Sequence, residues 1–106
     1  MKSIGIRKAI QLFGGTNIDI HKGYHDQSGF FDKDGKTYYI DTGDDRMMKN
    51  GQLNVMYREA IDRKDFSGKG GYNQWDFVRI INSMGYKIDK FPKEKERYWF
   101  NLKNLI

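Results

Sequence analysis

The stretch GFFDKDGKTYYID, residues 29–41, constrains the fold more than any other part of the chain. Asp34-Gly35 is a dipeptide favoured in two-residue type I′ turns, because both central positions of that turn require a positive φ. Aromatic and β-branched residues flank the dipeptide, as is typical of strands. The stretch therefore predicts a β-hairpin in which Phe30-Phe31 faces Tyr38-Tyr39.

Two other segments show the apolar spacing of amphipathic helices. The first predicts a helix over residues 3–13, capped by Ser3 and ended by Gly14-Gly15, with an apolar face of Ile6, Ala9, Ile10 and Phe13. The second predicts a helix over residues 73–84 that ends at Gly85. Asn73 is its expected N-cap and Asp76 its N3 residue, and its apolar face comprises Phe77, Ile80, Ile81 and Met84.

The remaining strand signals are weaker. Residues 16–25 alternate loosely and predict an edge strand. Asn50-Gly51 predicts a second tight turn, after which Leu53, Val55 and Tyr57 alternate as in a strand. Residues 52–62 also fit a helical stripe, but the specific turn dipeptide favours the strand. Two more strands, 86–88 and 97–102, are predicted around the charged loop 89–96.

These elements predict an α+β fold for a single domain spanning residues 1–106. We expect a small antiparallel sheet of four or five strands, with two short helices packed on one face. A degenerate winged helix with an N-terminal hairpin extension is the alternative architecture.

Composition narrows the functional classes. The chain has no Cys, which excludes disulfides, thiolate zinc sites and thiol nucleophiles and favours a cytoplasmic location. No apolar run approaches the roughly 20 residues needed to span a bilayer, so no membrane association is expected.

The net charge is +5, and it is unevenly spread along the chain. Residues 1–18 carry three bases and no acid, whereas residues 19–45 carry seven acids and three bases. A basic surface suits polyanions, although such a charge also simply favours solubility.

The triplet Asp41-Thr42-Gly43 resembles the active-site triplet of retroviral-type aspartic proteases. That resemblance would imply a dimer whose two carboxylates share a proton. Here Asp44-Asp45 follows directly, and like-charge repulsion would oppose ionisation of such a pair. No segment between 46 and 70 reads as a flap, and the only later apolar pair before a glycine, Ile80-Ile81, falls in a predicted helix. We therefore expect the triplet to form a turn at the end of a strand.

No strong metal or catalytic motif is present. His21 and His25 lie near Asp19 and Asp26, but no further nitrogen or sulfur ligand accompanies them, so they are interpreted as surface histidines. The DKDG sequence at 32–35 resembles the start of a calcium loop, yet Gly43 stands where the final Glu would be. No nucleophile–base–orienter set is evident. We expect no enzymatic activity, no catalytic residue, no metal, no cofactor and no small-molecule substrate.

Two arrangements predict contact with nucleic acid. In SGKGGYNQ, glycines expose backbone N–H groups beside a helix start, so Lys69 and its neighbours can hold a phosphate. A helix followed by a basic hairpin resembles the winged-helix organisation of DNA-binding domains over about 35 residues. The leading hypothesis is therefore a small basic module that binds nucleic-acid phosphate, with Trp99 or Tyr98 stacking on bases. Its predicted binding residues are Ser67, Lys69, Gly70, Gly71, Asn73, Gln74, Arg79, Asn82, Lys93, Lys95, Arg97 and Trp99.

The alternative hypothesis assigns the function to the acidic hairpin, residues 32–45. A phage or mobile-element accessory protein could use these carboxylates to bind and inhibit a host protein, by imitating the charge of nucleic acid. The two hypotheses differ in the partner, which is nucleic acid in one and a protein in the other.

Overall fold

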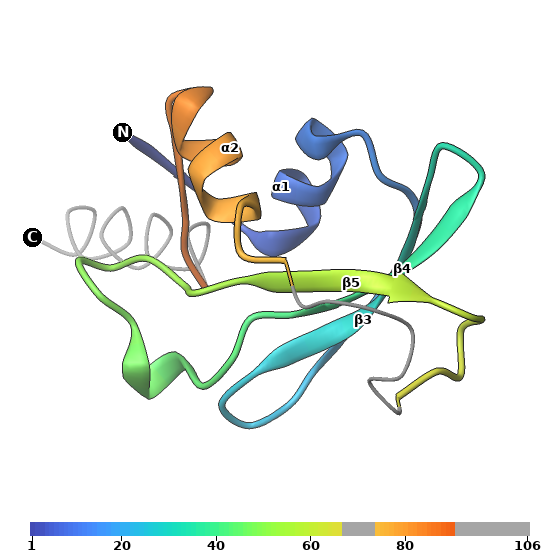
Figure 1. Cartoon of the computed structure of the whole chain (residues 1–106). Coiled ribbons are helices and arrows are strands. Elements are labelled where there is room, and N and C mark those ends of the chain that lie inside the picture. Colours follow the sequence, from blue (N-terminus) through green and yellow to red (C-terminus); the bar gives the residue numbers. More distant parts are fainter. Residues whose placement is uncertain (67–73, 91–106) are drawn as a thin grey trace, which may run out of the picture.

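The computed structural model describes residues 1–66 and 74–90 and has the predicted α+β architecture. Figure 1 shows two helices lying on one side of a sheet. The elements follow in the order β1 (Lys2–Ile4), α1 (Ile6–Phe13), β2 (Thr16–Lys22), β3 (Gln27–Lys33), β4 (Lys36–Asp41), the 3-10 turn η1 (Asp45–Met47), β5 (Met56–Ala60), α2 (Phe77–Ser83) and β6 (Tyr86–Ile88).

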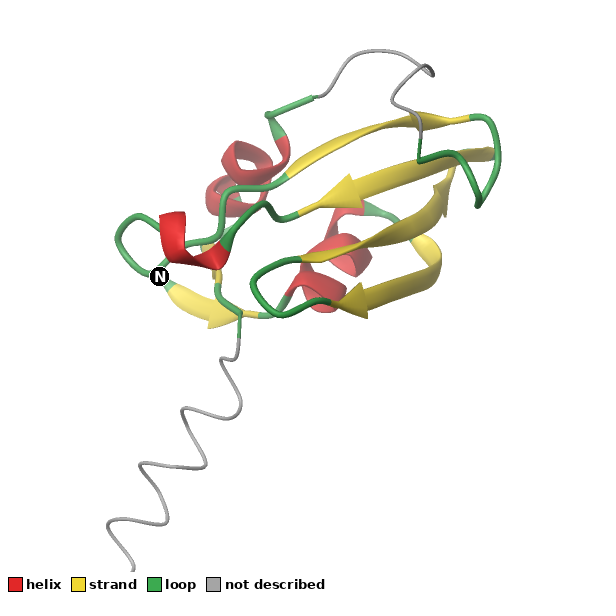
Figure 2. Cartoon of the chain, turned by 90° about the horizontal axis from the view of Figure 1, so that it is seen from below, coloured by secondary structure: helices red, strands yellow, loops and turns green. Residues whose placement is uncertain are grey.

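The main sheet is antiparallel and has the strand order β2-β3-β4-β5. Seen from below in Figure 2, its four strands lie in front of the helices, so both helices cover the same face. β2 is an edge strand, as predicted. β1 and β6 form a separate parallel pair beside the helices, with Lys2 opposite Tyr86 and Ile4 opposite Ile88.

The predicted hairpin is confirmed. Phe30 pairs with Tyr39 and Phe31 with Tyr38 across β3 and β4. Asp34 and Gly35 have φ values of 53° and 76°, the left-handed backbone that a type I′ turn requires. This local turn sets the register of the two central strands.

The second tight turn is also confirmed, at Asn50 and Gly51, with φ values of 56° and 71°. Across this turn, Lys49 and Gln52 form an isolated antiparallel β-bridge. The backbone N–H of the next residue, Leu53, donates to the carbonyl of Ile88 at 2.8 Å. The turn is thereby tied to β6. Within the ambiguous segment 52–62, residues 56–60 form β5, so the favoured strand interpretation is correct.

Both helix starts differ from the prediction. Ser3 lies in β1 rather than at a helix N-cap, and α1 begins after Gly5. Residues 2–4 form a strand because their backbone pairs with β6. Since β6 is distant in the sequence, local signals do not predict this pairing. Asp76 is the N-cap of α2 rather than its N3 residue, and its side chain makes no capping bond. The ends at Gly14 and Gly85 are as predicted. Asn73 and the predicted strand 97–102 lie outside the described residues.

The core lies between the helices and the sheet. Ile10, Phe31, Ile40, Phe77 and Ile81 are at most 1% exposed. Phe13 of α1 contacts the rings of three core aromatics, at centroid distances of 4.9 to 6.2 Å. These contacts fix α1 and α2 on the sheet. None of the helices in the described part of the chain is long and apolar enough to cross a bilayer.

The opposite face of the sheet carries a second, smaller packed region. Phe30, Tyr39 and Arg58 are neighbours across β3, β4 and β5. Phe66, in the segment after β5, packs its ring against Phe30 at 5.3 Å. Arg58 lies over the Tyr39 ring at 4.7 Å and forms an ion pair with Asp65 at 3.3 Å, with both charged side chains at most 4% exposed. The ion pair thus holds residues 61–66 against the sheet.

Candidate nucleic-acid interface

Three of the predicted binding residues are among the described residues: Gln74, Arg79 and Asn82. Gln74 pairs with Tyr57 through its backbone, which joins the entry of α2 to β5. Arg79 is exposed on α2, and Asn82 is half-buried one turn later. Arg79 and Asn82 thus lie together on α2, on the helix side, whereas Gln74 lies beside β5 at the edge of the sheet. The other predicted residues lie outside the described part of the chain: Ser67, Lys69, Gly70, Gly71, Asn73, Lys93, Lys95, Arg97 and Trp99.

The amphipathic pattern of α2 explains where Arg79 points. Phe77 and Ile81 are fully buried against the core, so the intervening Arg79 is directed to solvent. Asn82 lies closer to the core, and its Oδ1 is buried without a hydrogen-bond partner among the described residues. An unsatisfied buried acceptor is costly, so this oxygen weakens the packing of α2 rather than adding to its exposed surface.

The helix layer, which we define as β1, α1, α2 and β6, is strongly basic. Within residues 2–13 and 77–88 the sequence has no acid and five bases: Lys2, Arg7, Lys8, Arg79 and Lys87. Two acids flank the layer, Asp76 before α2 and Asp89 after β6. None of the five forms an ion pair with a carboxylate of the described residues. Asp76 is engaged with Tyr57: burial, followed by the charge of Asp76 and a hydrogen bond to it, raises the pKa of Tyr57 to about 12.

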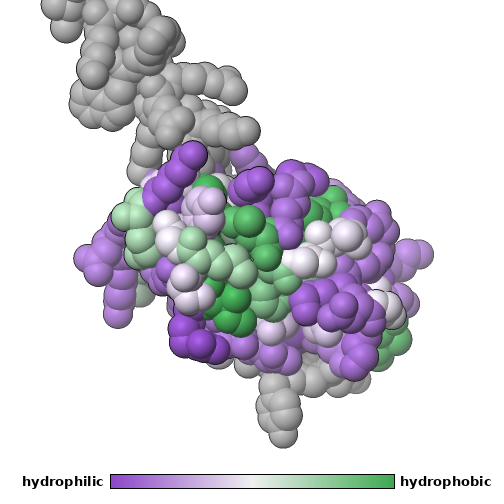
Figure 3. Space-filling model, turned by 90° about the horizontal axis from the view of Figure 1, so that it is seen from above, coloured by the Kyte–Doolittle hydropathy of each residue, from purple (hydrophilic) through white to green (hydrophobic). Residues whose placement is uncertain are grey.

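The centre of this layer is apolar. Figure 3 views the molecule from the helix side and shows hydrophobic residues gathered in the middle of the face, with hydrophilic residues around them. Leu12, Phe13 and Val78 are partly buried hydrophobic residues that pack on the core from α1 and α2, and Met84 is 45% exposed. The helix layer therefore combines positive charges that no described carboxylate pairs with and accessible apolar surface.

The sheet side has a different charge organisation, because several of its bases pair with its acids. Lys33 pairs with Asp34, Lys36 with Glu59, Arg46 with Asp44 and Arg63 with Asp32. Hydrogen bonds led by that from Asn17 lower the pKa of Asp32, and hydrogen bonds from Arg46 lower that of Asp44. The carboxylates of the acidic hairpin are thus largely neutralised within the protein, which weakens the alternative of a charge-based protein inhibitor.

Asp41-Thr42-Gly43 forms the predicted turn at the end of β4. The Asp41 Oδ1 accepts a hydrogen bond from the Gly43 N–H at 2.7 Å, and Thr42 is 1% exposed. The Thr42 hydroxyl accepts from the backbone N–H of Gln27 at 3.0 Å. Both side chains serve the local backbone, as expected of a turn.

His25, Asp44 and Asp45 form the group of possible metal ligands within the described residues. His25 bonds to Asp45 at 3.1 Å, and the Lys90 ammonium donates to the other Asp45 oxygen and to the Tyr24 carbonyl. The hydrogen bond from Lys90, with a further one from His25, lowers the pKa of Asp45. A cation already occupies this carboxylate, so the cluster connects three loops and offers little to a metal. His21, by contrast, is exposed beside Asp19.

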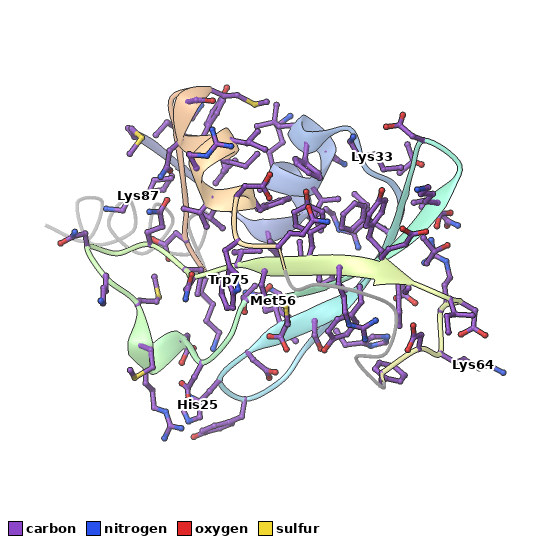
Figure 4. All side chains as sticks on the ribbon, viewed as in Figure 1. His25, Lys33, Met56, Lys64, Trp75 and Lys87 are labelled. Carbon is purple, nitrogen blue, oxygen red and sulfur yellow. The ribbon has the colours of Figure 1, made fainter. Side chains whose placement is uncertain are left out.

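Sequence reasoning did not select Lys2, Arg7, Lys8 or Lys87 as binding residues. The absence of acids from residues 1–18 was the available signal, since it leaves the bases there without local partners. It also did not select Trp75, which is 56% exposed beside the start of α2. Figure 4 shows Lys87 far from Lys64, which lies at the opposite end of the molecule.

No protein-family model, curated protein or solved structure matches the chain.

Proposed function

We propose that the protein binds nucleic acid through its phosphate backbone, using the basic helix layer. One observation supports this most directly: Lys2, Arg7, Lys8, Arg79 and Lys87 lie on one layer and form no ion pair with a described carboxylate. Bases already paired with carboxylates have less to gain from a phosphate, whereas unpaired bases release condensed counterions from the nucleic acid when they bind.

The remaining surface features are compatible with that partner. The apolar centre of the helix layer and the exposed Trp75 offer stacking surface, and stacking of a base on an aromatic side chain is worth about 1–3 kcal/mol. The described part of the interface is assembled from both ends of the described chain. It differs from the predicted surface, which placed most contacts in residues 67–73 and 93–99.

The salt dependence of binding tests the proposal. Fluorescence anisotropy with labelled single- and double-stranded oligonucleotides should show affinity falling linearly with salt on a double-logarithmic plot. The slope is expected to be about −0.7 per phosphate contact for single strands and about −0.9 for duplex. An affinity that does not change between about 50 and 200 mM salt would contradict phosphate binding.

A matched pair of double variants tests the location. Lys8→Gln with Arg79→Gln removes two charges from the helix layer and should reduce the magnitude of the slope by about 1.4–1.8. Lys36→Gln with Lys64→Gln removes two charges from the sheet side and should leave the slope unchanged. Equal effects of the two double variants would show that net charge alone, and not this layer, determines binding.

A further inference from the structure

A cavity of about 260 Å³ lies between the Asn50-Gly51 turn and α2. Ligand pockets for drug-sized molecules occupy about 300–1,000 Å³, so this volume suits one small ring system rather than an extended ligand. Its lining residues are Met47, Lys49, Gln52, Leu53, Asn54 and Val78.

The walls of the cavity are of two kinds. Leu53 is 1% exposed, and together with Val78 and Met47 it provides an apolar surface for a flat ring. A methionine thioether also makes favourable contacts with aromatic rings. Gln52 and Asn54 also line the cavity, and both residues carry side-chain amides, the groups that form paired hydrogen bonds with base edges.

Gln52 carries an unused acceptor. Its Oε1 is buried and has no hydrogen-bond partner among the described residues, although its backbone is paired with Lys49. A buried acceptor left unpaired costs about 1–3 kcal/mol, which a donor brought by a ligand would recover once the partly exposed Gln52 side chain turns this oxygen toward the cavity. Every nucleobase presents an amino or imino N–H that can serve as this donor.

Positive charge lies at the edge of the cavity. Lys49 is one of the lining residues. Lys87 crosses the adjoining turn, since a Cβ placed on Gly51 would lie 3.2 Å from the Lys87 Nζ. A base held in the cavity would therefore have a lysine of the helix layer close to its own phosphate.

From these features we infer that the cavity takes one unstacked base of a single-stranded nucleic acid. The inference rests on the function proposed above, and it adds base contact to phosphate binding. Gln52 provides the hydrogen-bond acceptor, the apolar walls enclose the ring, and Lys49 and Lys87 attract the flanking phosphate. Stacked bases of a duplex are not available to such a cavity, so single strands should bind more tightly than duplexes.

The first test compares an oligonucleotide with the same oligonucleotide carrying abasic sites. The protein should bind the intact strand about tenfold more tightly than the abasic one. The variant Gln52→Leu removes the acceptor and keeps similar bulk, so it should reduce the preference for the intact strand while retaining the salt slope of the parent. The Lys8→Gln and Arg79→Gln double variant should show the reverse, a smaller slope with the preference for the intact strand preserved.

The second test uses adenosine monophosphate alone, followed by NMR of the Leu53 and Val78 methyl groups. Their resonances should shift in the parent, and a higher nucleotide concentration should be needed for the same shift in Gln52→Leu. A filling variant, Val78→Phe, should abolish the shift. Unmoved parent resonances, or equal affinity for intact and abasic strands, would overturn the base pocket even if phosphate binding holds. If no oligonucleotide binds at low salt, the proposed function fails, and the nucleotide titration still decides whether the cavity accepts a base.

Discussion

The buried Arg58–Asp65 ion pair leads to the largest expected effect on stability. The Arg58 and Asp65 side chains are 3% and 4% exposed, so neither charge can be solvated if its partner is removed. Arg58 also donates to the Asp65 carbonyl at 2.7 Å, and the Asp65 carboxylate accepts from the Ile61 N–H at 2.9 Å. Removing one partner of a buried pair typically costs about 3–5 kcal/mol. Asp65→Ala should therefore lower the free energy of unfolding by about that amount.

The total stability of a domain this size is about 5–15 kcal/mol, so this loss should be obvious in urea unfolding followed by circular dichroism. The double variant Arg58→Met with Asp65→Leu removes both charges and keeps apolar contacts with Tyr39. It should be clearly more stable than Asp65→Ala, because no isolated charge stays buried. The exposed pair Lys36–Glu59 serves as the control, and Glu59→Gln should change stability by less than about 1 kcal/mol. A similar small effect for Asp65→Ala, or strict additivity in the Arg58–Asp65 cycle, would refute this reasoning.

Three other predictions concern pH and packing. The hydrogen bond from Lys90 lowers the pKa of Asp45, so stability should fall as the pH drops through that lowered pKa. Thermal unfolding of Asp45→Asn should therefore depend less on acid pH than unfolding of the parent. An unchanged dependence would rule out this cause. The pKa of Tyr57 is raised to about 12 from an ordinary value of 10.0, so Tyr57 ionises in the unfolded chain before it ionises in the folded protein. Stability should therefore decline as the pH rises between these two values. Tyr57→Phe should reduce that decline, and an alkaline profile identical to that of the parent would contradict this reasoning. A Cβ at Gly29 would lie 1.9 Å from the Asp19 carbonyl oxygen, so Gly29→Ala should destabilise the protein by about 1–3 kcal/mol or more in urea unfolding, and a variant as stable as the parent would show that β2 yields easily.

The central hairpin and the helical segments could be predicted from sequence because their signals are local. Asp34-Gly35 and Asn50-Gly51 specify turns through their own backbone preferences, and the apolar spacing of α1 and α2 follows from which residues must reach the core. β1 could not be predicted in this way. Its three residues form a strand only because β6, more than 80 positions later, lies beside them.

The candidate site was predictable only in part for a similar reason. Arg79 and Asn82 follow from the helical pattern of α2. The contribution of Arg7 and Lys8 depends on α1 and α2 packing on the same face of the sheet, which the sequence does not state. The cavity beside Gln52 likewise requires the turn at Gly51 to meet α2 and β6, and no local signal specifies that contact.

The parallel pairing of β1 with β6 has a consequence for how the chain folds. The hairpin of β3 and β4 joins residues close in sequence and can form early. In contrast, β1 has no partner strand until Tyr86, which pairs with Lys2, is in place. Such long-range closure is entropically slow. During synthesis, β1 should therefore stay unpaired until almost all of the described chain has left the ribosome, and formation of the parallel pair should be among the last steps of folding.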